Sequence, residues 1–354
     1  MILVINAGSS SIKFELFASD LTSVLEGAVT EIGGASELRV GADTVAAEAP
    51  NHTAALGLIL QQLEAAGHPV STLSAAGHRV VHGGAALTAP ARIDADVIGA
   101  IEACEALAPL HNPHNLSGIR ALQALAPDLP QVACFDTAFH ATNPDIATAY
   151  ALPEAERAQG IRRYGFHGMS YAGMVDWFGE RLPKRLLALH LGNGASLCAI
   201  HEGRSIATSM GYSPLDGLVM GTRTGCIDGM AVLRMADAHG LKRAEDLLNK
   251  QSGLKALAGT SDMRALLARD DDAARFAVAH FCYWAARQAG SVIVAMGGVD
   301  ALAFTGGIGE NAAPIRQRIV QHLSFLGDLP VHVVPADEER QIARDVLSVL
   351  AKDA

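Results

Sequence analysis

The chain has 354 residues, and its 27 Lys and Arg residues against 37 Asp and Glu residues give a formal net charge of −10 at pH 7. This acidic balance argues against a nucleic-acid partner, because neutralising phosphates requires a basic excess. Hydrophobic residues make up 50% of the sequence, which excludes a disordered chain, and the length predicts roughly two domains at about 150 residues each.

Cysteine usage predicts a reducing compartment. The five cysteines are odd in number, far apart and without a CxxC pair, so neither a disulfide framework nor a thiolate zinc site is indicated. We expect a cytoplasmic protein without a signal peptide, because the first residues lack a basic region. The weakly charged stretch 291–309 is interrupted by Asp300 and by glycines, so we expect no membrane span.

The chain begins with two predicted strands around a turn of small residues. Residues 2–5 are apolar, residues 7–11 are Ala, Gly and Ser, and residues 12–17 alternate between apolar and polar as far as Leu16, with Phe17 after it. Alternation indicates a half-buried strand. A similar unit recurs at 186–200, where a turn at 192–196 separates two apolar runs. The echo suggests an internal duplication.

Helices are predicted between these units. Thr53 is a candidate N-cap for a helix that ends at Gly67, and Asn115 is a candidate N-cap for a second helix that ends at Pro127. Near the end of the chain, Asp337 is placed to cap a last amphipathic helix. Further apolar runs at 132–135 and 301–304 predict strands, so helices and strands alternate and the fold class is α/β.

Three glycine-rich or serine-rich segments are candidate phosphate loops. In residues 6–13, small residues allow backbone N–H groups to approach an anion and Lys13 adds a positive charge, although an ordinary hairpin turn is the favoured interpretation of this segment taken alone. Residues 190–196 echo it, which favours a pair of phosphate loops. In residues 304–311 a strand ends in glycines before a helix with Pro314 in its first turn, as in a nucleotide site or a tight connection.

Polar residues cluster in five further segments, at 77–84, 111–115, 134–140, 162–168 and 221–225. Arginines beside glycines in these segments suit carboxylate or phosphate oxygens. Asp136 directly follows a predicted strand, which is a common active-site position in α/β folds. The histidines of this set do not have the spacing of a metal site.

Taken together, these segments resemble the acetate kinase family. The matching strings span residues 6–345 in family order: NAGSSSIKF, GHRVVHGG, LAPLHNPHN, FDTAFH, RRYGFHG, HLGNGAS, GYSPLDGLVMGTRTG, SDMR, FTGGIGEN and DEERQIARD. The resemblance implies two duplicated actin-like (ribonuclease H-like) α/β domains with an ATP cleft between them. The first would span residues 1–140 and be completed by a helix at 338–354, and the second, at 141–337, would carry most of the nucleotide site.

The resemblance also implies a role for each matching residue. Catalytic roles fall to Asp136, which would orient a reactant or Mg²⁺ or act as a base, with orientation favoured because a carboxylate nucleophile carries no proton, and to His167 and Arg223, which would stabilise the transferring phosphoryl group. Arg79 would hold the substrate carboxylate, and a small apolar pocket would be lined by Val81, Leu110, Phe166 and Pro214. ATP contacts fall to Lys13, His190, Leu191, Gly192, Asn193, Gly194, Asp262, Met263, Arg264, Gly307, Ile308, Gly309, Glu310 and Asn311. Asn6 and Glu338 would hold Mg²⁺, or Mn²⁺ in its place.

The implied reaction is reversible in-line transfer of the γ-phosphoryl group of ATP to acetate, giving acetyl phosphate for acetyl-CoA biosynthesis, in a homodimer. Val81 and Phe166 would keep the pocket small, which favours acetate. A propionate or other short-chain acyl kinase stays open, because an apolar pocket discriminates one methylene by only ~1–3 kcal/mol. A catalytically silent nucleotide-binding regulator is the alternative of another class, although such a protein would be expected to lose part of the catalytic set.

Four features depart from the family pattern. Cys226 stands where the family usually has Asp, Gly229 where Pro is usual, and His114 where a second Pro is common. The chain is also shorter, with a cut between Gly327 and Val331 that we expect to trim a surface hairpin rather than the site.

Overall fold

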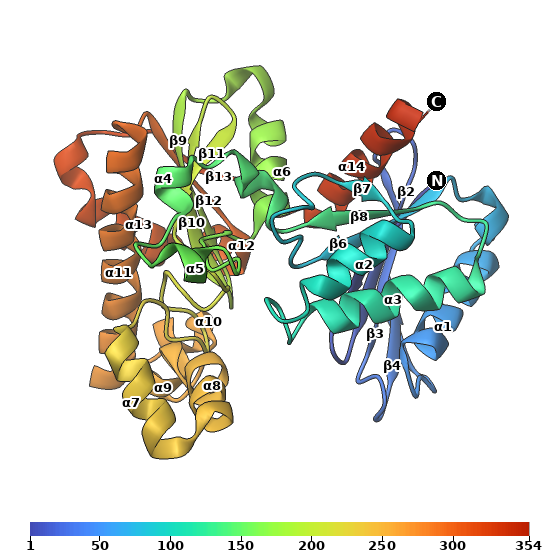
Figure 1. Ribbon diagram of the computed structural model, residues 1–354, viewed down its shortest axis with the longest axis horizontal. Coiled ribbons are helices and arrows are strands. Elements are labelled where there is room, and N and C mark those ends of the chain that lie inside the picture. Colours follow the sequence, from blue (N-terminus) through green and yellow to red (C-terminus); the bar gives the residue numbers. More distant parts are fainter. Residues whose placement is uncertain (354) are drawn as a thin grey trace. The chain divides into compact units, whose positions relative to one another are not determined.

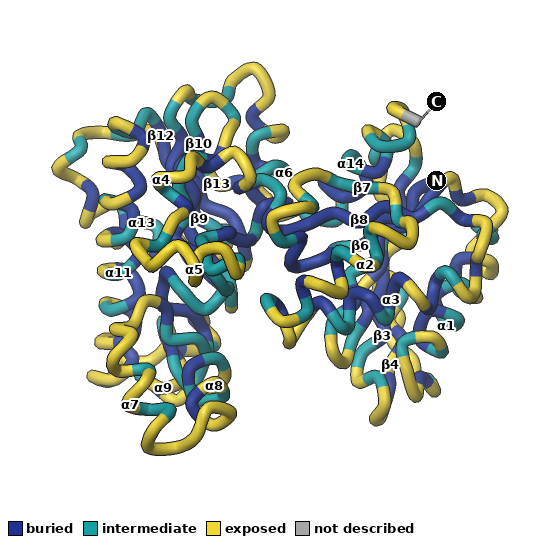
Figure 2. Tube along the Cα trace, in the orientation of Figure 1, coloured by how far each residue is buried: buried dark blue, intermediate teal, exposed yellow. Residues whose placement is uncertain are grey.

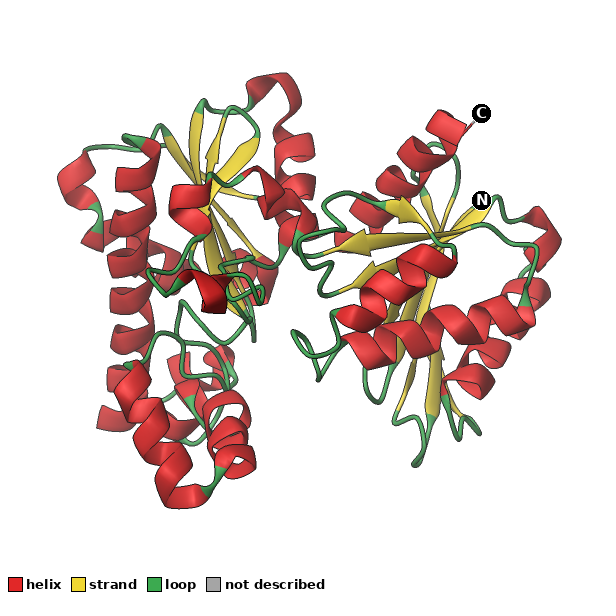
Figure 3. Cartoon of the chain, in the orientation of Figure 1, coloured by secondary structure: helices red, strands yellow, loops and turns green. Residues whose placement is uncertain are grey.

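The computed structural model describes residues 1–353 and divides into two compact units (Figure 1). Unit 1 comprises residues 1–139 together with the chain from Asp337 onward, and unit 2 comprises residues 140–336. Each unit contains one β-sheet with helices packed on it (Figure 3).

Unit 1 is built on an eight-stranded sheet in the order β5-β4-β3-β2-β1-β6-β8-β7. Its strands are β1 (Ile2–Ala7), β2 (Ile12–Phe17), β3 (Ser23–Thr30), β4 (Glu37–Val40), β5 (Asp43–Ala46), β6 (Ala75–Val80), β7 (Ala91–Arg92) and β8 (Gln131–Phe135). Its helices are α1 (His52–Ala65), the 3₁₀ turn η1 (Val70–Thr72), α2 (Ala95–Ala103), α3 (Asn112–Leu125) and α14 (Glu338–Asp353).

Unit 2 is built on a five-stranded sheet in the order β11-β10-β9-β12-β13. Its strands are β9 (Arg185–Leu191), β10 (Ala195–His201), β11 (Arg204–Thr208), β12 (Ala301–Thr305) and β13 (Val331–Val333). Helical segments, beginning at the unit boundary, are η2 (Ala138–Thr142), α4 (Asp145–Thr148), α5 (Glu154–Arg157), α6 (Gly168–Phe178), η3 (Gly179–Arg181), α7 (Gly229–His239), α8 (Leu241–Lys250), α9 (Gly253–Ala258), α10 (Met263–Leu267), α11 (Asp272–Met296), α12 (Gly306–Asn311), α13 (Ala313–His322) and η4 (Ser324–Leu326).

The two sheets repeat one pattern of strand order and direction. In unit 1, β1 pairs antiparallel with β2 and parallel with β6, while β2 pairs antiparallel with β3 and β6 parallel with β8. In unit 2, β9, β10, β11, β12 and β13 take the places of β1, β2, β3, β6 and β8 with the same directions. The repeat confirms the internal duplication expected from the two strand–turn–strand segments.

Helix starts were predicted less well than strands. The N-cap of α1 is Asn51, whose side chain accepts from the N–H of Ala54, so the prediction of Thr53 was wrong. Asn115 is not a cap either, because α3 begins at Asn112 and carries Pro113 in its first turn. A proline there loses no hydrogen bond, since the first N–H groups of a helix have no intrahelical acceptor. The predicted capping role of Asp337 is confirmed by its contact with the N–H of Arg340.

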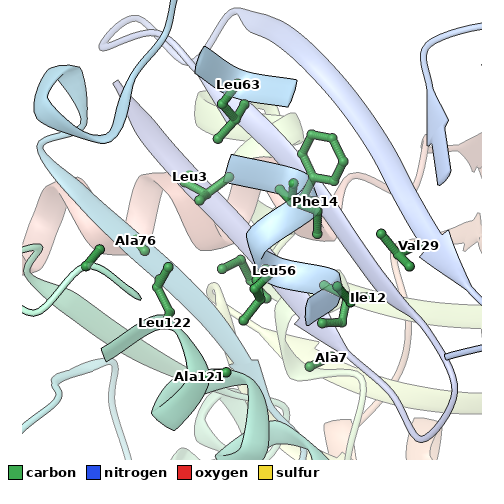
Figure 4. Close-up of a cluster of buried hydrophobic side chains, with 14 of the residues drawn as sticks. Leu3, Ala7, Ile12, Phe14, Val29, Leu56, Leu63, Ala76, Ala121 and Leu122 are labelled. Atoms are coloured by element: carbon green, nitrogen blue, oxygen red, sulfur yellow. The ribbon is translucent and has the colours of Figure 1, made fainter. Parts of the chain in front are cut away.

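The side chains of β1 point alternately to the two faces of the unit 1 sheet, and helices cover both faces. Leu3, Ile5 and Ala7 point to one face, where they join buried residues of α1 and α3 (Figure 4). The opposite face is covered by α14, against which a Cβ on Gly77 would lie 2.6 Å from Ile342 and 2.7 Å from Val346. Glycine at position 77 therefore lets the last helix approach the centre of the sheet.

In unit 2, α11 packs along the sheet strands while α7 remains uncovered. The 25-residue α11 buries one face that contacts β9, β10 and β11. In contrast, α7 has no buried residue, and Met230 and Leu233 on it are exposed (Figure 2). Among the residues that the structure describes, no helix combines the length and apolar character needed to cross a bilayer.

Three buried histidines predict a loss of stability in acid. Burial lowers the pKa of His78, His82 and His140 to about 4. The unfolded chain, with histidine pKa values near 6.5, therefore takes up protons first, so the stability is fully present above pH 6.5 and declines as the pH falls toward 4. We expect each histidine to lower the free energy of unfolding by roughly 1–2 kcal/mol at pH 5, which urea denaturation at pH 7.5 and 5 would measure. Equal free energies of unfolding at the two pH values would contradict this expectation.

Candidate functional site

Two of the sequence-predicted residues of unit 1, Arg79 and Asp136, form an ion pair at the carboxyl ends of two parallel strands. Arg79 lies near the end of β6, and Asp136 follows β8 directly. The Nε of Arg79 donates to Oδ1 of Asp136 at 3.1 Å, and its Nη2 donates to Oδ2 at 2.8 Å. This bidentate geometry is the strong form of an arginine–carboxylate contact.

Glu338 at the start of α14 contacts the same guanidinium, with Oε2 at 3.4 Å from Nη1 of Arg79. Burial raises the pKa of the Asp136 carboxyl above its ordinary value, while the Arg79 guanidinium opposes that shift; the Asp136 side chain is only 3% exposed. Burial alone would lower the pKa of Arg79. The nearby carboxylates of Asp136 and Glu338 outweigh this effect, so the pKa of Arg79 lies above the ordinary value for arginine. Arg79 is thus a partly buried cation held by two acids.

Asn6 and Lys13 are paired across β1 and β2 near the first small-residue turn. Asn6 shares a face of β1 with Val4, which pairs with Gly77 under α14, and Arg79 is two residues beyond Gly77 on that same face. Lys13 is exposed. The alternation therefore places Asn6, Arg79 and Lys13 on the α14 face of the sheet.

The loop after β6 is held by two asparagines of α3 that the sequence did not mark as site residues. Asn115 accepts from the N–H of Val81 at 3.1 Å and donates to the carbonyl of Ala7 at 2.8 Å, so it joins the end of β1 to that loop. Asn112 makes a matching pair of bonds with the backbone of His82. Val81 is buried, whereas Leu110, on the connection before α3, is 44% exposed.

We expect Asn115→Ala to destabilise the protein by roughly 2–4 kcal/mol, because it leaves the buried N–H of Val81 and carbonyl of Ala7 without their acceptor and donor. The measurement is chemical denaturation of both proteins. The matched control is Asn249→Ala, which removes an exposed side-chain bond to the carbonyl of Glu245 within α8 and should cost less than about 1 kcal/mol. Equal losses in the two variants would contradict the role of Asn115.

In unit 2, two stacked histidines stand at the centre of the predicted site. The rings of His167 and His190 are stacked with centroids 4.2 Å apart. Nδ1 of His167 contacts the hydroxyl of Ser196 at 2.8 Å, and Nδ1 of His190 contacts that of Ser170 at 2.8 Å. His167 itself adopts a left-handed backbone, with φ of 59°, immediately before α6. A non-glycine residue in this conformation is uncommon, and such strain concentrates at functional sites.

Arg223 and His167 converge on Gly194, in the second predicted phosphate loop. A Cβ on Gly194 would lie 2.9 Å from Nη2 of Arg223 and 3.3 Å from Nε2 of His167. The other end of the guanidinium, Nη1, donates to the carbonyl of Pro214 at 2.7 Å. Burial lowers the pKa of Arg223. A guanidinium and an imidazole thus meet beside a residue whose backbone can be approached closely.

Backbone hydrogen bonds hold the loop at 217–226, which carries Arg223 and is called the arginine loop below. Met220 N–H donates to the carbonyl of Arg223, and the N–H of Cys226 donates to that of Gly217. The N–H of Thr224 reaches the carbonyl of Leu248 at the end of α8. These bonds fix the loop that carries Arg223 against the helices that follow it.

The predicted nucleotide segments lie on neighbouring strands of the unit 2 sheet. The segment His190, Leu191, Gly192, Asn193 and Gly194 ends β9 and forms the turn to β10, and the segment Gly307, Ile308, Gly309, Glu310 and Asn311 belongs to α12 after β12. Strands β9 and β12 are parallel, with Thr305 opposite His190. A Cβ on Gly306 would lie 2.8 Å from the carbonyl of Leu191, so this glycine lets the two turns approach each other.

The remaining predicted segment, Asp262, Met263 and Arg264, begins α10. Asp262 caps the helix and also pairs with Nη2 of Arg264 at 3.0 Å, while Met263 is buried. The Arg264 side chain is 88% exposed. Phe166 is buried beside His167, and Pro214 is partly buried. The structure therefore brings His167, His190 and Arg223 together and leaves Arg264 exposed.

Unit 1 offers two oxygen donors that suit a magnesium ion. Among the described residues, no group of three or more His, Cys, Asp or Glu side chains is arranged to hold a metal ion. Asn6 and Glu338 provide a carboxamide and a carboxylate oxygen, which are hard donors. Mg²⁺ commonly binds through one or two such groups together with waters and substrate phosphates. The residues present therefore fit an ion that arrives with a nucleotide.

Comparison with known proteins decides the family. The profile of the acetokinase family matches residues 1–346. The chain belongs to the acetokinase family. It is 42% identical over 392 aligned positions to a protein named acetate kinase from Rhodopseudomonas palustris, with 98% of this chain and 97% of that protein covered.

Two solved structures of the family have the same fold. A propionate kinase from Francisella tularensis gives a TM-score of 0.93 at 38% identity, covering 97% of this chain and 98% of its own. The acetate kinase of Porphyromonas gingivalis gives a TM-score of 0.90 at 35% identity, covering 99% of both chains. The protein thus has the actin-like α/β fold of this family, as the sequence predicted.

The 392 aligned positions shared with the Rhodopseudomonas protein exceed the 354 residues of this chain. That protein therefore has insertions that this chain lacks. The predicted cut lies in residues 327–330, which connect η4 to β13 and are mostly exposed. None of the site residues described above lies in this connection.

Proposed function

We propose that this protein is an acetate kinase, which transfers the γ-phosphoryl group of ATP to the carboxylate of acetate and yields acetyl phosphate and ADP, reversibly and in line. The observation that carries the proposal is the family match over residues 1–346. The local geometry supports it, because Arg79, Asp136, His167 and Arg223 are all present, with Asp136 buried and the other three partly buried.

The proposed chemistry needs positioning and charge neutralisation rather than covalent catalysis. Charge in a transferring phosphoryl group spreads over its equatorial oxygens, where a guanidinium and an imidazole can donate hydrogen bonds. In this proposal Arg223 and His167 provide those donors, and the contact of Nδ1 of His167 with Ser196 orients the ring so that Nε2 faces the reacting group. The oxygen of acetate that attacks carries no proton at neutral pH, so no general base is required.

Arg79 binds the substrate carboxylate in this mechanism, and Asp136 orients Arg79. The edge of the guanidinium formed by Nε and Nη2 is occupied by Asp136, which leaves the other edge, where Nη1 now lies 3.4 Å from Glu338, available to a second carboxylate. Val81 and Phe166, with Leu110 and Pro214, are proposed to contact the methyl group of acetate.

Magnesium is proposed to be held by Asn6 and Glu338, with Mn²⁺ able to replace it; when bound, the ion neutralises charge on the phosphates. The protein's own residues supply the rest of the nucleotide site, through Lys13 and the segments at 190–194, 262–264 and 307–311. Backbone N–H groups at the start of α12 and those of Asn193 and Gly194 are the donors suited to phosphate oxygens, since the N–H of Gly192 already donates to the carbonyl of Gly194.

A propionate kinase is the second candidate, favoured by the TM-score of 0.93 to the Francisella propionate kinase. The two proposed activities would use the same charged residues and differ in the length of the preferred acyl chain. The ratio of the kcat/KM values for acetate and propionate therefore distinguishes them.

A homodimer in the cytoplasm is the proposed state of the protein. The uncovered helix α7, with Met230 and Leu233 exposed, and the exposed Phe276 and Tyr283 of α11 are apolar side chains that a second copy could bury. All five cysteines are free, which suits a reducing compartment. Sedimentation equilibrium of the wild-type protein and of a Met230→Asp/Leu233→Asp variant tests the dimer.

The reaction is tested by trapping acyl phosphate as its hydroxamate. Purified protein is incubated with ATP, Mg²⁺ and acetate, propionate or butyrate, and we expect acetate to give the largest yield. Protein that is folded by circular dichroism and yet forms no acyl phosphate from any of the three would overturn the enzyme proposal. Nucleotide binding in that protein, measured by calorimetry, would support the catalytically silent regulator instead.

A further inference from the structure

The segments that carry His167 and hold Arg223 are joined to each other inside unit 2. Residues 162–167 lead into α6 and end at His167, while residues 211–217 include Pro214, whose carbonyl accepts from Arg223. The N–H groups of Tyr164 and Gly165 both donate to the carbonyl of Gly211, at 3.0 and 3.3 Å. The spacing between the two charged groups therefore depends on how these two segments are fixed together.

A side-chain ion pair adds a second link between the same segments. Nη1 of Arg163 donates to Oδ2 of Asp216 at 3.1 Å. The Arg163 guanidinium also lies over the ring of Tyr150, 4.5 Å from its centroid. The hydroxyl of Tyr150 in turn accepts from the N–H of Tyr212 at 3.1 Å. Arg163 is thus held from two sides, by a carboxylate and by an aromatic ring that contacts the 211–217 segment.

Asp216 connects the ion pair to the backbone of residues 214–217, where the carbonyl of Pro214 contacts Arg223. Its Oδ1 accepts from the N–H of Gly217 at 2.8 Å, which fixes the carboxylate to its own turn two residues after Pro214. The carbonyl of Gly217 accepts from the N–H of Cys226 and so closes the arginine loop. One carboxylate therefore bonds Arg163 with one oxygen and the base of the arginine loop with the other.

We propose that Arg163 and Asp216 are positioning residues for phosphoryl transfer, which set the distance between His167 and Arg223 without touching the substrate. The inference rests on the proposed acyl kinase function, in which both of those residues neutralise the group in transfer. The side chains of Arg163 and Asp216 are 37% and 33% exposed, and exposed ion pairs contribute little to stability. The pair therefore acts on the geometry of the site and not on the stability of the fold.

The test compares Asp216→Asn with a matched control, Asp246→Asn. Asp246 pairs with Arg243 through the same atoms at the same 3.1 Å and with similar exposure, 51% and 31%, but on α8. We expect Asp216→Asn to lower kcat about tenfold, because small misplacements of catalytic groups lower rates strongly. The KM values for ATP and acetate should change less than about twofold, and the melting temperature should stay within about 2 °C. Asp246→Asn should leave all four quantities unchanged.

Two further measurements separate positioning from a general structural effect. In an Arg223→Ala background, Asp216→Asn should lower kcat no further, because its effect passes through Arg223. A full tenfold loss in that background, or an unchanged kcat in the single variant, would overturn the proposal. Arg163→Lys, which keeps the charge but loses the planar group over Tyr150, should retain more activity than Arg163→Ala.

A crystal structure of Asp216→Asn tests the inference independently of activity. The contact between Nη1 of Arg223 and the carbonyl of Pro214, 2.7 Å in the wild-type protein, should lengthen or break. An unchanged contact would overturn the positioning role even if the wild-type protein makes acyl phosphate. If the wild-type protein makes none, the proposed function fails, and the displacement of Arg223 still decides whether the pair positions it.

Discussion

Replacing Arg223 by alanine is expected to lower kcat by about 10³-fold while the KM for ATP changes only a few-fold. An arginine that neutralises charge developing on a transferring phosphoryl group contributes about 10³-fold or more to kcat. The Arg223 guanidinium is anchored by the carbonyl of Pro214 and directed toward Gly194, so its position is set before substrate binds. Interactions that strengthen in the transition state change kcat more than ground-state binding.

The control for this prediction is Arg223→Lys, which keeps a positive charge but lacks the planar fork. Its ammonium group cannot bond the Pro214 carbonyl and still face Gly194, so we expect only partial recovery of kcat. His167→Ala should also lower kcat, and the double variant should lose less than the product of the two single losses, because both groups act on the same charge. A near-normal kcat in Arg223→Ala, measured by steady-state kinetics, would exclude Arg223 from the transition state.

Several central strands were predictable because an alternating pattern or a short apolar run is visible in the sequence without knowledge of the partner strand. Residues 12–16 alternate and lie in β2, and the apolar run at 186–191 lies within β9. The edges of both turns differed, because Ala7 belongs to β1 and because Ala195 and Ser196 extend β10 by pairing with Leu191 and His190. The sequence did not predict β3, β4, β5, β6, β7, β11 or β13. Backbone pairing, and not the residue types, decides where a strand ends.

Helix starts depended on competition between neighbouring polar residues. Asn51 and Thr53 are both good N-caps, and the sequence alone does not say which backbone turns first. Asn115 looked like a cap but is buried in α3, where its amide bonds the ends of two strands from unit 1. A residue with long-range partners of that kind cannot be recognised from its sequence neighbours.

Parts of the site followed from the sequence and other parts did not. The adjacency of Arg79 and Asp136 follows from parallel strands, whose carboxyl ends meet at one edge of the sheet. The convergence of Arg223 and His167 on Gly194 brings together three segments far apart in sequence, so no spacing rule predicts it. The sequence therefore identified the residues of the site, whereas the distances between those on loops could be known only from the structure.

Two of the departures from the family pattern have a physical explanation. Gly229 is the first residue of α7, after the capping Asp228, and proline is well suited to that position because no hydrogen bond is lost there. His114 lies in the first turn of α3 with its ring stacked on His52, 6.0 Å between centroids, and Nε2 of His52 lies 2.7 Å from the carbonyl of Gly8 in the first small-residue turn. Nothing in the structure explains the exchange at Cys226.

Replacing Arg79 by alanine is expected to raise the KM for acetate about 10- to 100-fold and to change the KM for ATP less than about threefold. A hydrogen bond between charged groups contributes about 1.5–3 kcal/mol, which corresponds to that range. Asp136 occupies the Nε and Nη2 edge of the guanidinium, so we expect acetate to bind at Nη1 and to displace Glu338 from it.

Because Arg79→Ala also leaves Asp136 buried without its cation, the variant must be compared with Arg79→Lys, which restores a charge beside that carboxylate. We expect Arg79→Lys to recover most of the melting temperature but little of the acetate affinity, since an ammonium group cannot bond Asp136 through two atoms and a substrate carboxylate through a third. Initial rates at varied acetate and saturating ATP, together with thermal unfolding, measure the two effects separately. A wild-type KM for acetate in a folded Arg79→Lys protein would mean that the substrate is held elsewhere, and Arg79 would then serve only to neutralise Asp136 and Glu338.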